Sequence, residues 1–310
     1  MRLLDTTTIQ LHEFFDDDIP PYAILSHTWG DGEISYQNLE QAKTEVNPRP
    51  GYGKIRQCCQ LARSGGYLYL WIDTCCIDKT SSAELSEAIN SMYRWYRDAG
   101  ICYAYLKDVS QTSLDDESSV KAWCVSYLRF VPASRWFTRG WTLQELLAPK
   151  NLVFFNKDWV EIGNKTDLET KIHLATGIEP QLIRTPHIAC VAQKMSWASK
   201  RRTTRHEDRS YCLMGLFDVQ MPLLYGEGGE KAFLRLQYEI AKQSDDESLF
   251  AWNDASLHLC GVFAPSPEAF VDSGDVISAA FHDDYHRKPW SVGNRGLAIE
   301  FDNPTVSGQD

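Results

Sequence analysis

The first half of the chain alternates between short apolar runs and stretches in which apolar residues recur every three or four positions. The apolar runs are bounded by Gly, Pro or polar residues and cover residues 22–26, 67–73, 101–106 and 152–155. Their length and continuity are typical of strands that are buried on both faces. The periodic stretches predict amphipathic helices and cover residues 53–63, 85–96 and 141–147.

Strands that alternate with helices predict a parallel sheet with helices on both faces, because each crossover places a helix over the sheet. We therefore predict an α/β fold, a flavodoxin-like three-layer sandwich with a mostly parallel sheet. Ligands of such sheets bind beyond the carboxyl ends of the strands. Two of these ends carry polar residues, at Ser26–Trp29 and at Asp73–Cys76, so we expect a site there.

The second half of the chain is less periodic, and we predict a mixed helical and β region there. Phe233, Leu236 and Ile240 share one face of a predicted helix over residues 229–243. The expected divisions are a first domain over residues 1–155, a mainly helical extension over 156–257 that packs on it, and a region of short strands and loops over 258–310.

Composition excludes several classes of protein. The net charge is −11, from 31 Lys and Arg against 42 Asp and Glu, which argues against a nucleic-acid partner. No apolar run approaches the ~18 residues of a membrane span, and the acidic N-terminus does not resemble a signal peptide. The nine cysteines include no C-x-x-C pair and are interpreted as reduced, buried thiols of a cytoplasmic protein. No residue spacing predicts a metal site.

Three segments together resemble the fungal heterokaryon incompatibility (HET) domain. They are YAILSHTWG at 22–30, LWIDTCCIDK at 70–79 and SRWFTRGWTLQELLAP at 134–149. The resemblance implies an effector of self/non-self recognition and programmed cell death. Such effectors usually become active by self-association, so a homo-oligomer and an upstream recognition protein are the implied partners.

HET domains in turn resemble TIR domains, several of which cleave NAD at the bond between nicotinamide and ribose. Their catalytic glutamate lies in a stretch similar to Trp-Cys-x-x-Glu-Leu. Residues 141–146 (WTLQEL) match it, with Thr142 in place of the cysteine. The resemblance therefore implies that Glu145 is catalytic, that NAD(P)+ is the substrate and that no further cofactor is required.

The spacing around Glu145 allows two interpretations. Leu143, Leu146 and Leu147 form one helical stripe, which places Glu145 on the opposite face together with Trp141. There Trp141 would form the wall of a pocket, and the carboxylate would stabilise the positive charge left on ribose when nicotinamide departs, as in glycoside cleavage. Spacing alone favours a solvated glutamate on a helix surface, whereas the resemblance favours catalysis.

The remaining candidate residues also have two interpretations each. Ser26, His27 and Trp29 form either the edge of a ligand crevice or a turn beside the core. Asp73 either binds ribose hydroxyls or caps the following loop. Arg139, just before the predicted helix, either holds a phosphate or forms an ion pair with an acidic side chain.

Two alternative functions follow from the same residues. The first is a non-enzymatic signalling module that triggers death through protein–protein contacts, for which the aromatic residues would suit an interface. The second is a hydrolase in which Cys75 or Cys76 forms a thiolate pair with His27. A basic cluster between residues 200 and 209 is interleaved with Glu207 and Asp208, and we interpret it as local salt bridges.

Overall fold

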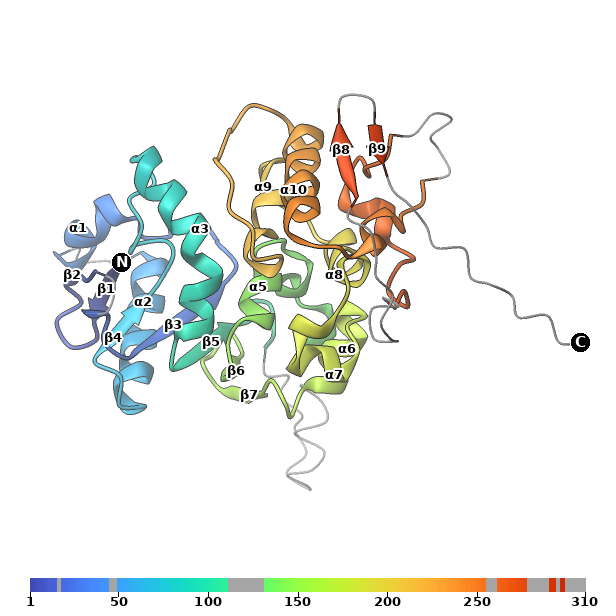
Figure 1. Ribbon diagram of the computed structural model, residues 1–310. Coiled ribbons are helices and arrows are strands. Elements are labelled where there is room, and N and C mark those ends of the chain that lie inside the picture. The colour runs from blue at the N-terminus through green and yellow to red at the C-terminus, as the bar shows by residue number, and fades with distance from the viewer. Residues whose placement is uncertain are drawn as a thin grey trace, which may run out of the picture.

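The fold is α/β and is built on a seven-stranded mixed sheet (Figure 1). The computed structural model describes residues 1–15, 18–44, 49–110, 131–254, 261–277, 290–293 and 296–298. The strand order is β2-β1-β4-β3-β5-β6-β7. In chain order the strands are β1 (Arg2–Asp5), β2 (Leu11–Glu13), β3 (Tyr22–His27), β4 (Tyr69–Trp71), β5 (Ile101–Tyr105), β6 (Leu152–Phe155) and β7 (Glu161–Asn164).

The four predicted strands form the centre of the sheet and are parallel, in the order β4-β3-β5-β6. The edges differ from the prediction. β1 and β2 extend one side and β7 the other, each antiparallel to its neighbours. β2 and β7 lack an apolar run, because an edge strand is held by backbone pairing with one neighbour and needs little burial. β1 lies between β2 and β4, and its buried residues Leu3 and Leu4 form too short a run to predict a strand. The predicted parallel character is therefore confined to the central strands.

The helices of the first half follow the predicted pattern. They are α1 (Leu39–Thr44), α2 (Pro50–Ser64), α3 (Ser82–Asp98) and α5 (Thr142–Leu147). The Ser81 hydroxyl accepts a hydrogen bond from the Glu84 amide at 3.3 Å and so caps the N-terminus of α3. α2 begins earlier than its periodic pattern because Pro50 is suited to the first helical turn.

The second half is mainly helical, as predicted, apart from short strands. Its helices are α6 (Glu169–Thr176), α7 (Pro180–Arg184), α8 (Val191–Ser199), α9 (Asp208–Tyr211) and α10 (Gly229–Gln243). β8 (Ser291–Gly293) pairs with β9 (Gly296–Ala298) as a separate two-stranded ladder. Residues 111–119 of the polar loop that follows β5 lie outside the described residues, and so do Cys124 and Cys260.

Helices cover both faces of the central sheet. Neighbouring residues of a strand point to opposite faces, and β3 is buried along its whole length. The Ser26 side chain contacts α5 on one face, where Trp71 of β4 also packs against Trp95 of α3. The His27 ring contacts Lys54 of α2 on the other face. The three-layer arrangement of the prediction therefore holds for the central strands.

The second half of the chain is joined to the segment that leads into α5. The Gly140 amide donates to the Arg202 carbonyl at 2.9 Å, and the Arg202 amide donates to the Thr138 carbonyl at 2.8 Å. In Figure 1, α5 lies between the sheet and the helices α8, α9 and α10. Among the described residues, no helix is long and apolar enough to cross a membrane.

Candidate active site at the carboxyl edge of the sheet

The carboxyl end of β3 lies at a topological switch point. The connection after β3 leads to β4 on one side, and the connection after β4 returns to β5 on the other side of β3. The two crossovers therefore diverge beside β3, which is the position where open α/β sheets bind ligands. Ser26 and His27 end this strand, and Asp73 follows β4, so the sequence prediction of polar residues at this edge is confirmed.

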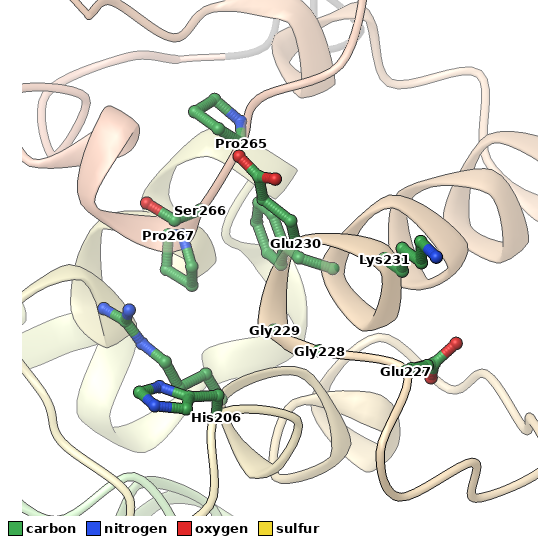
Figure 2. Close-up of a pocket in the computed structure, with 11 residues that line it drawn as sticks. His206, Glu227, Gly228, Gly229, Glu230, Lys231, Pro265, Ser266 and Pro267 are labelled. Carbon is green, nitrogen blue, oxygen red and sulfur yellow. The ribbon is translucent and has the colours of Figure 1, made fainter.

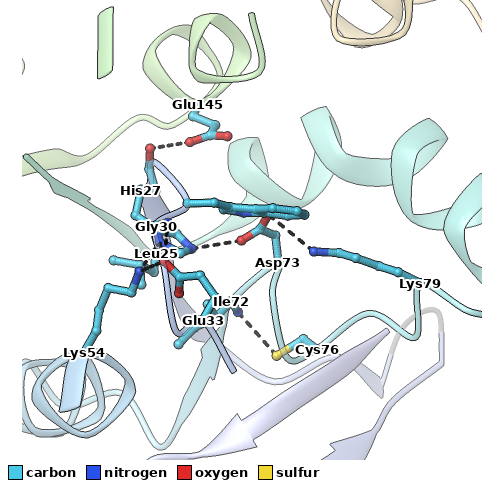
Figure 3. A network of polar contacts seen from close by, with 12 residues as sticks. Leu25, His27, Gly30, Glu33, Lys54, Ile72, Asp73, Cys76, Lys79 and Glu145 are labelled. Carbon is cyan, nitrogen blue, oxygen red and sulfur yellow. Dashed lines mark hydrogen bonds and ion pairs between the residues drawn. The ribbon is translucent and has the colours of Figure 1, made fainter. Parts of the chain in front are cut away.

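Glu145 of α5 lies beside the end of β3 and is 7% exposed. The Ser26 hydroxyl donates a hydrogen bond to Glu145 Oε2, as Figure 3 shows. Ser26 Oγ in turn accepts a hydrogen bond from Trp136 Nε1 at 2.8 Å. Since Ser26 can donate only one proton, this chain of contacts fixes the direction of the hydroxyl toward Glu145.

The surroundings of Glu145 favour its protonated form. Burial raises the pKa of this carboxyl to about 8, against the opposing effect of the Ser26 hydrogen bond. Asp73 raises the pKa further, whereas the positive charges of Arg139 and Arg201 lower it. A carboxyl with such a pKa is mostly neutral at pH 7, so in this conformation it does not supply a full negative charge.

Of the two interpretations of α5, the solvated surface at Glu145 that spacing alone favours is wrong. All six of its residues are buried, because the second half of the chain covers the helix. Arg201 Nη1 donates to the Arg139 carbonyl at 2.9 Å and to Thr142 Oγ1 at 3.1 Å. Thr142 Oγ1 also donates to the Trp136 carbonyl. The basic cluster had been interpreted as surface salt bridges, and no signal in the sequence singles out Arg201 as its buried member.

His27 is held between two charged side chains, with its own side chain 1% exposed. Its Nε2 lies 3.0 Å from Asp73 Oδ1, and its Nδ1 lies 2.6 Å from Lys54 Nζ. A lysine ammonium can only donate, so Nδ1 accepts from Lys54 and Nε2 carries the proton that faces Asp73. Both ring nitrogens are therefore already engaged.

Trp29 and Lys79 complete the surroundings of Asp73 (Figure 3). Trp29 Nε1 donates to Asp73 Oδ2 at 2.8 Å, and Lys79 Nζ lies 3.5 Å from the centroid of the Trp29 ring. Burial of Asp73 opposes its ionisation, but the charge of Lys79 and the hydrogen bonds from His27 and Trp29 outweigh burial and hold its pKa well below the usual range. Trp29 itself is 53% exposed, so the indole is fixed at the edge of the site yet open to solvent.

Arg139 and Trp141 are directed toward the second half of the chain. Arg139 is half-buried, and its Nη2 lies 3.5 Å from Thr204 Oγ1. The Trp141 side chain hydrogen-bonds to Asp208. The structure thus brings Ser26 to Glu145, and His27 and Trp29 to Asp73, while the side chains of Arg139 and Trp141 contact Thr204 and Asp208 of the second half.

The thiolate pair of the hydrolase interpretation is not formed. Cys75 is fully buried, and Cys76 Sγ accepts a hydrogen bond from the Ile72 amide at 3.3 Å. Burial and the neighbouring Cys76 thiol raise the pKa of Cys75 well above its usual value. Since Asp73 and Lys54 occupy both nitrogens of His27, neither cysteine has a base to activate it.

The described residues contain no group of three or more His, Cys, Asp or Glu side chains that could hold a metal ion. Asp78 accepts hydrogen bonds from the amide and the hydroxyl of Thr80, at 2.9 and 2.6 Å. Asp78 therefore stabilises the turn that precedes α3. Lys54, Lys79 and Glu33 were not identified from the sequence, because each lies in a separate segment with no motif around it.

A pocket of about 380 Å³ lies away from these residues, at the first turn of α10 (Figure 2). Its lining combines basic and acidic side chains with glycine and proline, namely His206, Arg209, Glu227, Gly228, Gly229, Glu230, Lys231, Phe233, Pro265, Ser266 and Pro267. None of the residues predicted from the sequence lines it.

The structure is thus an α/β sheet with a buried carboxyl and a His–Asp–Lys cluster at its carboxyl edge. The family model of the heterokaryon incompatibility protein (HET) matches residues 22–132. The chain is 48% identical over 228 residues to the vegetative incompatibility protein HET-E-1 of Podospora anserina. The chain therefore carries a HET domain over residues 22–132.

The matched region is most of this chain but a small part of HET-E-1. The match to HET-E-1 covers 72% of this chain but only 16% of that relative. The family match contains Ser26, His27, Trp29 and Asp73 but ends before α5 and Glu145. No solved structure matches the chain significantly.

Proposed function

We propose that this protein is a cell-death effector of fungal self/non-self recognition that cleaves the bond between nicotinamide and ribose in NAD(P)+ after self-association. The position of Glu145 carries the proposal: a carboxyl at the carboxyl end of the central strand, bonded to Ser26, in a stretch similar to the catalytic stretch of TIR domains. Numbered along the chain, the parallel strands β4-β3-β5-β6 lie in the order 2-1-3-4, as do the first four strands of a flavodoxin-like sheet. The relation to an incompatibility protein supports the biological role.

The chemistry requires an ionised carboxylate. When nicotinamide leaves, positive charge develops on the ribose ring, and a carboxylate nearby stabilises that charge. Burial raises the pKa of Glu145 to about 8, so we propose that the conformation described here is a resting one. A rearrangement that exposes α5, or the positive charge of bound NAD+, would favour ionisation. Self-association is the event that we propose to drive this rearrangement.

Nicotinamide release by the full chain tests the proposal. The chain is concentrated until it assembles and is incubated with NAD+ and NADP+, and free nicotinamide is measured by chromatography. Glu145→Gln keeps the size and the neutral state of the buried carboxyl and should abolish release. Glu169→Gln, which alters a glutamate paired with Arg184 on α6, is the matched control and should retain it.

The burial of Glu145 is also the observation that favours the non-enzymatic alternative, in which the chain kills by assembly alone. Expression in fungal cells separates the two functions. The enzyme predicts that Glu145→Gln abolishes both death and the fall in cellular NAD. The signalling module predicts that the variant still assembles and still kills while NAD is unchanged.

A further inference from the structure

The loop that follows β3 holds a carboxylate between two hydrogen-bond donors. Glu33 Oε1 accepts a hydrogen bond from the Gly30 amide at 2.9 Å and one from the Lys54 ammonium at 2.5 Å. It also lies 3.8 Å from His27 Nδ1. The Glu33 side chain is 17% exposed. A backbone amide and an ammonium that converge on one oxyanion are the donors that proteins use for carboxylate and phosphate groups.

Three lysines from three different connections gather at this edge of the sheet. Lys54 belongs to α2, Lys79 follows β4, and Lys107 follows β5. Lys107 lies directly over the loop, since a methyl group on Gly30 would come within 2.5 Å of its Nζ. Among the described residues the carboxylates that face this group are Glu33 and Asp73. The cluster is thus locally cationic within a chain of net charge −11.

The lysines depend on these carboxylates for their charge. Burial lowers the pKa of Lys54, while Glu33 and Asp73 raise it and Lys107 lowers it. Like charges held close together in a half-buried place are stabilised only by an anion among them. Glu33 supplies that anion from a flexible side chain, which can leave by rotation about its own bonds without movement of the loop.

We propose that Lys54, Lys107 and the Gly30 amide form a phosphate-binding subsite, which Glu33 occupies in the free chain and which a phosphate group of a nucleotide takes over. The diphosphate of such a nucleotide carries two negative charges and more acceptor oxygens than a carboxylate, so it competes effectively for these donors. The inference rests on the proposed function for the identity of the nucleotide. It adds the residues that recognise the diphosphate and an internal competitor for it.

Calorimetric titration of the full chain with ADP-ribose tests the subsite. This ligand contains the diphosphate but lacks the bond to nicotinamide, so binding is measured without cleavage. Glu33→Gln removes the competing charge and should tighten binding by about 3- to 10-fold. Lys54→Met should weaken binding by about 10-fold or more, equal to about 1.4 kcal/mol, and Lys54→Arg should restore most of it. Lys43→Met, which alters a lysine of α1 paired with Glu40, should have no effect.

The opposite effects of the two variants make the result decisive. Unchanged or weaker binding by folded Glu33→Gln overturns the subsite, even where Lys54→Met does not fold. Titration with inorganic pyrophosphate distinguishes recognition of the diphosphate itself from non-specific attraction of anions. The subsite predicts that pyrophosphate ranks the variants as ADP-ribose does, whereas equal binding by all variants shows non-specific attraction and rejects the subsite.

If ADP-ribose binds as predicted but nicotinamide is never released, the subsite stands and NAD(P)+ cleavage fails. If release depends on Glu145 but not on Lys54 or Glu33, the function stands and the subsite fails.

Discussion

The Ser26 hydroxyl donates a hydrogen bond to the Glu145 carboxyl across 119 positions of the sequence. The bond joins the central strand β3 to the helix α5 beneath the cover of the second half of the chain. It places one acidic group inside the protein, where its ionisation is coupled to the conformation of the site. The first two predictions concern this pair.

The pH dependence of stability should reveal the buried carboxyl. Burial raises the pKa of Glu145 from 4.5 to about 8, so between these values the folded chain holds a proton that the unfolded chain releases. The contribution of Glu145 to the free energy of unfolding is therefore fully present below pH 4.5. It is lost as the pH rises through 8, by at most about 1.4 kcal/mol per pH unit.

Glu145→Gln removes that dependence because its side chain stays neutral. Denaturant unfolding of both proteins from pH 5 to pH 9 should show the variant gaining stability over the wild type as the pH rises. Parallel curves over the whole range would show that Glu145 is ionised in the folded chain.

Removal of the Ser26 hydroxyl should destabilise the protein. Ser26→Ala leaves Trp136 Nε1 and the Glu145 carboxyl without their shared partner, at a cost of about 1–3 kcal/mol in the free energy of unfolding. Ser210 is the matched control, because it is fully buried and its hydroxyl has no hydrogen-bond partner among the described residues. Ser210→Ala should therefore change stability little, and an equal loss in both variants would contradict the role of the Ser26 contacts.

The junction between the two halves of the chain should be sensitive to a single methyl group. A Cβ on Gly140 would lie 2.5 Å from Thr203 Cγ2 and 3.1 Å from Cys212 Sγ, so Gly140→Ala should cost about 1–3 kcal/mol of stability. Gly53 lies within α2 with no atom near its would-be Cβ. Gly53→Ala should stabilise the chain by about 0.5–1 kcal/mol. Thermal unfolding compares the two, and a stable Gly140→Ala would show that the halves separate easily.

The described cysteines should be unreactive in the folded protein. Burial raises the pKa of Cys58 and Cys102 well above the usual value and that of Cys59 to about 12, so few thiolates exist at pH 8. Iodoacetamide followed by mass spectrometry should label Cys58, Cys59, Cys75, Cys76 and Cys102 only after unfolding. Rapid labelling of Cys75 or Cys76 in the native chain would revive the cysteine-hydrolase alternative.

The pattern of neighbouring residues was sufficient to predict the central strands and the major helices. The run at 22–26 became β3 and the Ser81–Glu84 cap began α3, because burial on both faces and helix capping leave their signals in neighbouring residues. The strands β1, β2 and β7 were missed, because β2 and β7 are edge strands held by backbone pairing and the apolar run of β1 has only two residues, Leu3 and Leu4. Polar residues at the ends of β3 and β4 were also identified correctly as meeting at one edge of the sheet.

The sequence by itself determined the kind of fold, the HET resemblance and the choice of Ser26, His27, Asp73 and Glu145 as candidates for one site. Only the tertiary structure decided what surrounds them. Arg201 and the helices of the second half cover α5 and convert an apparent surface glutamate into a buried, protonated one. Lys54, Glu33 and Lys107 converge from separate segments. Burial and charge at a site are sums over groups that are distant along the chain, so no local pattern contains them.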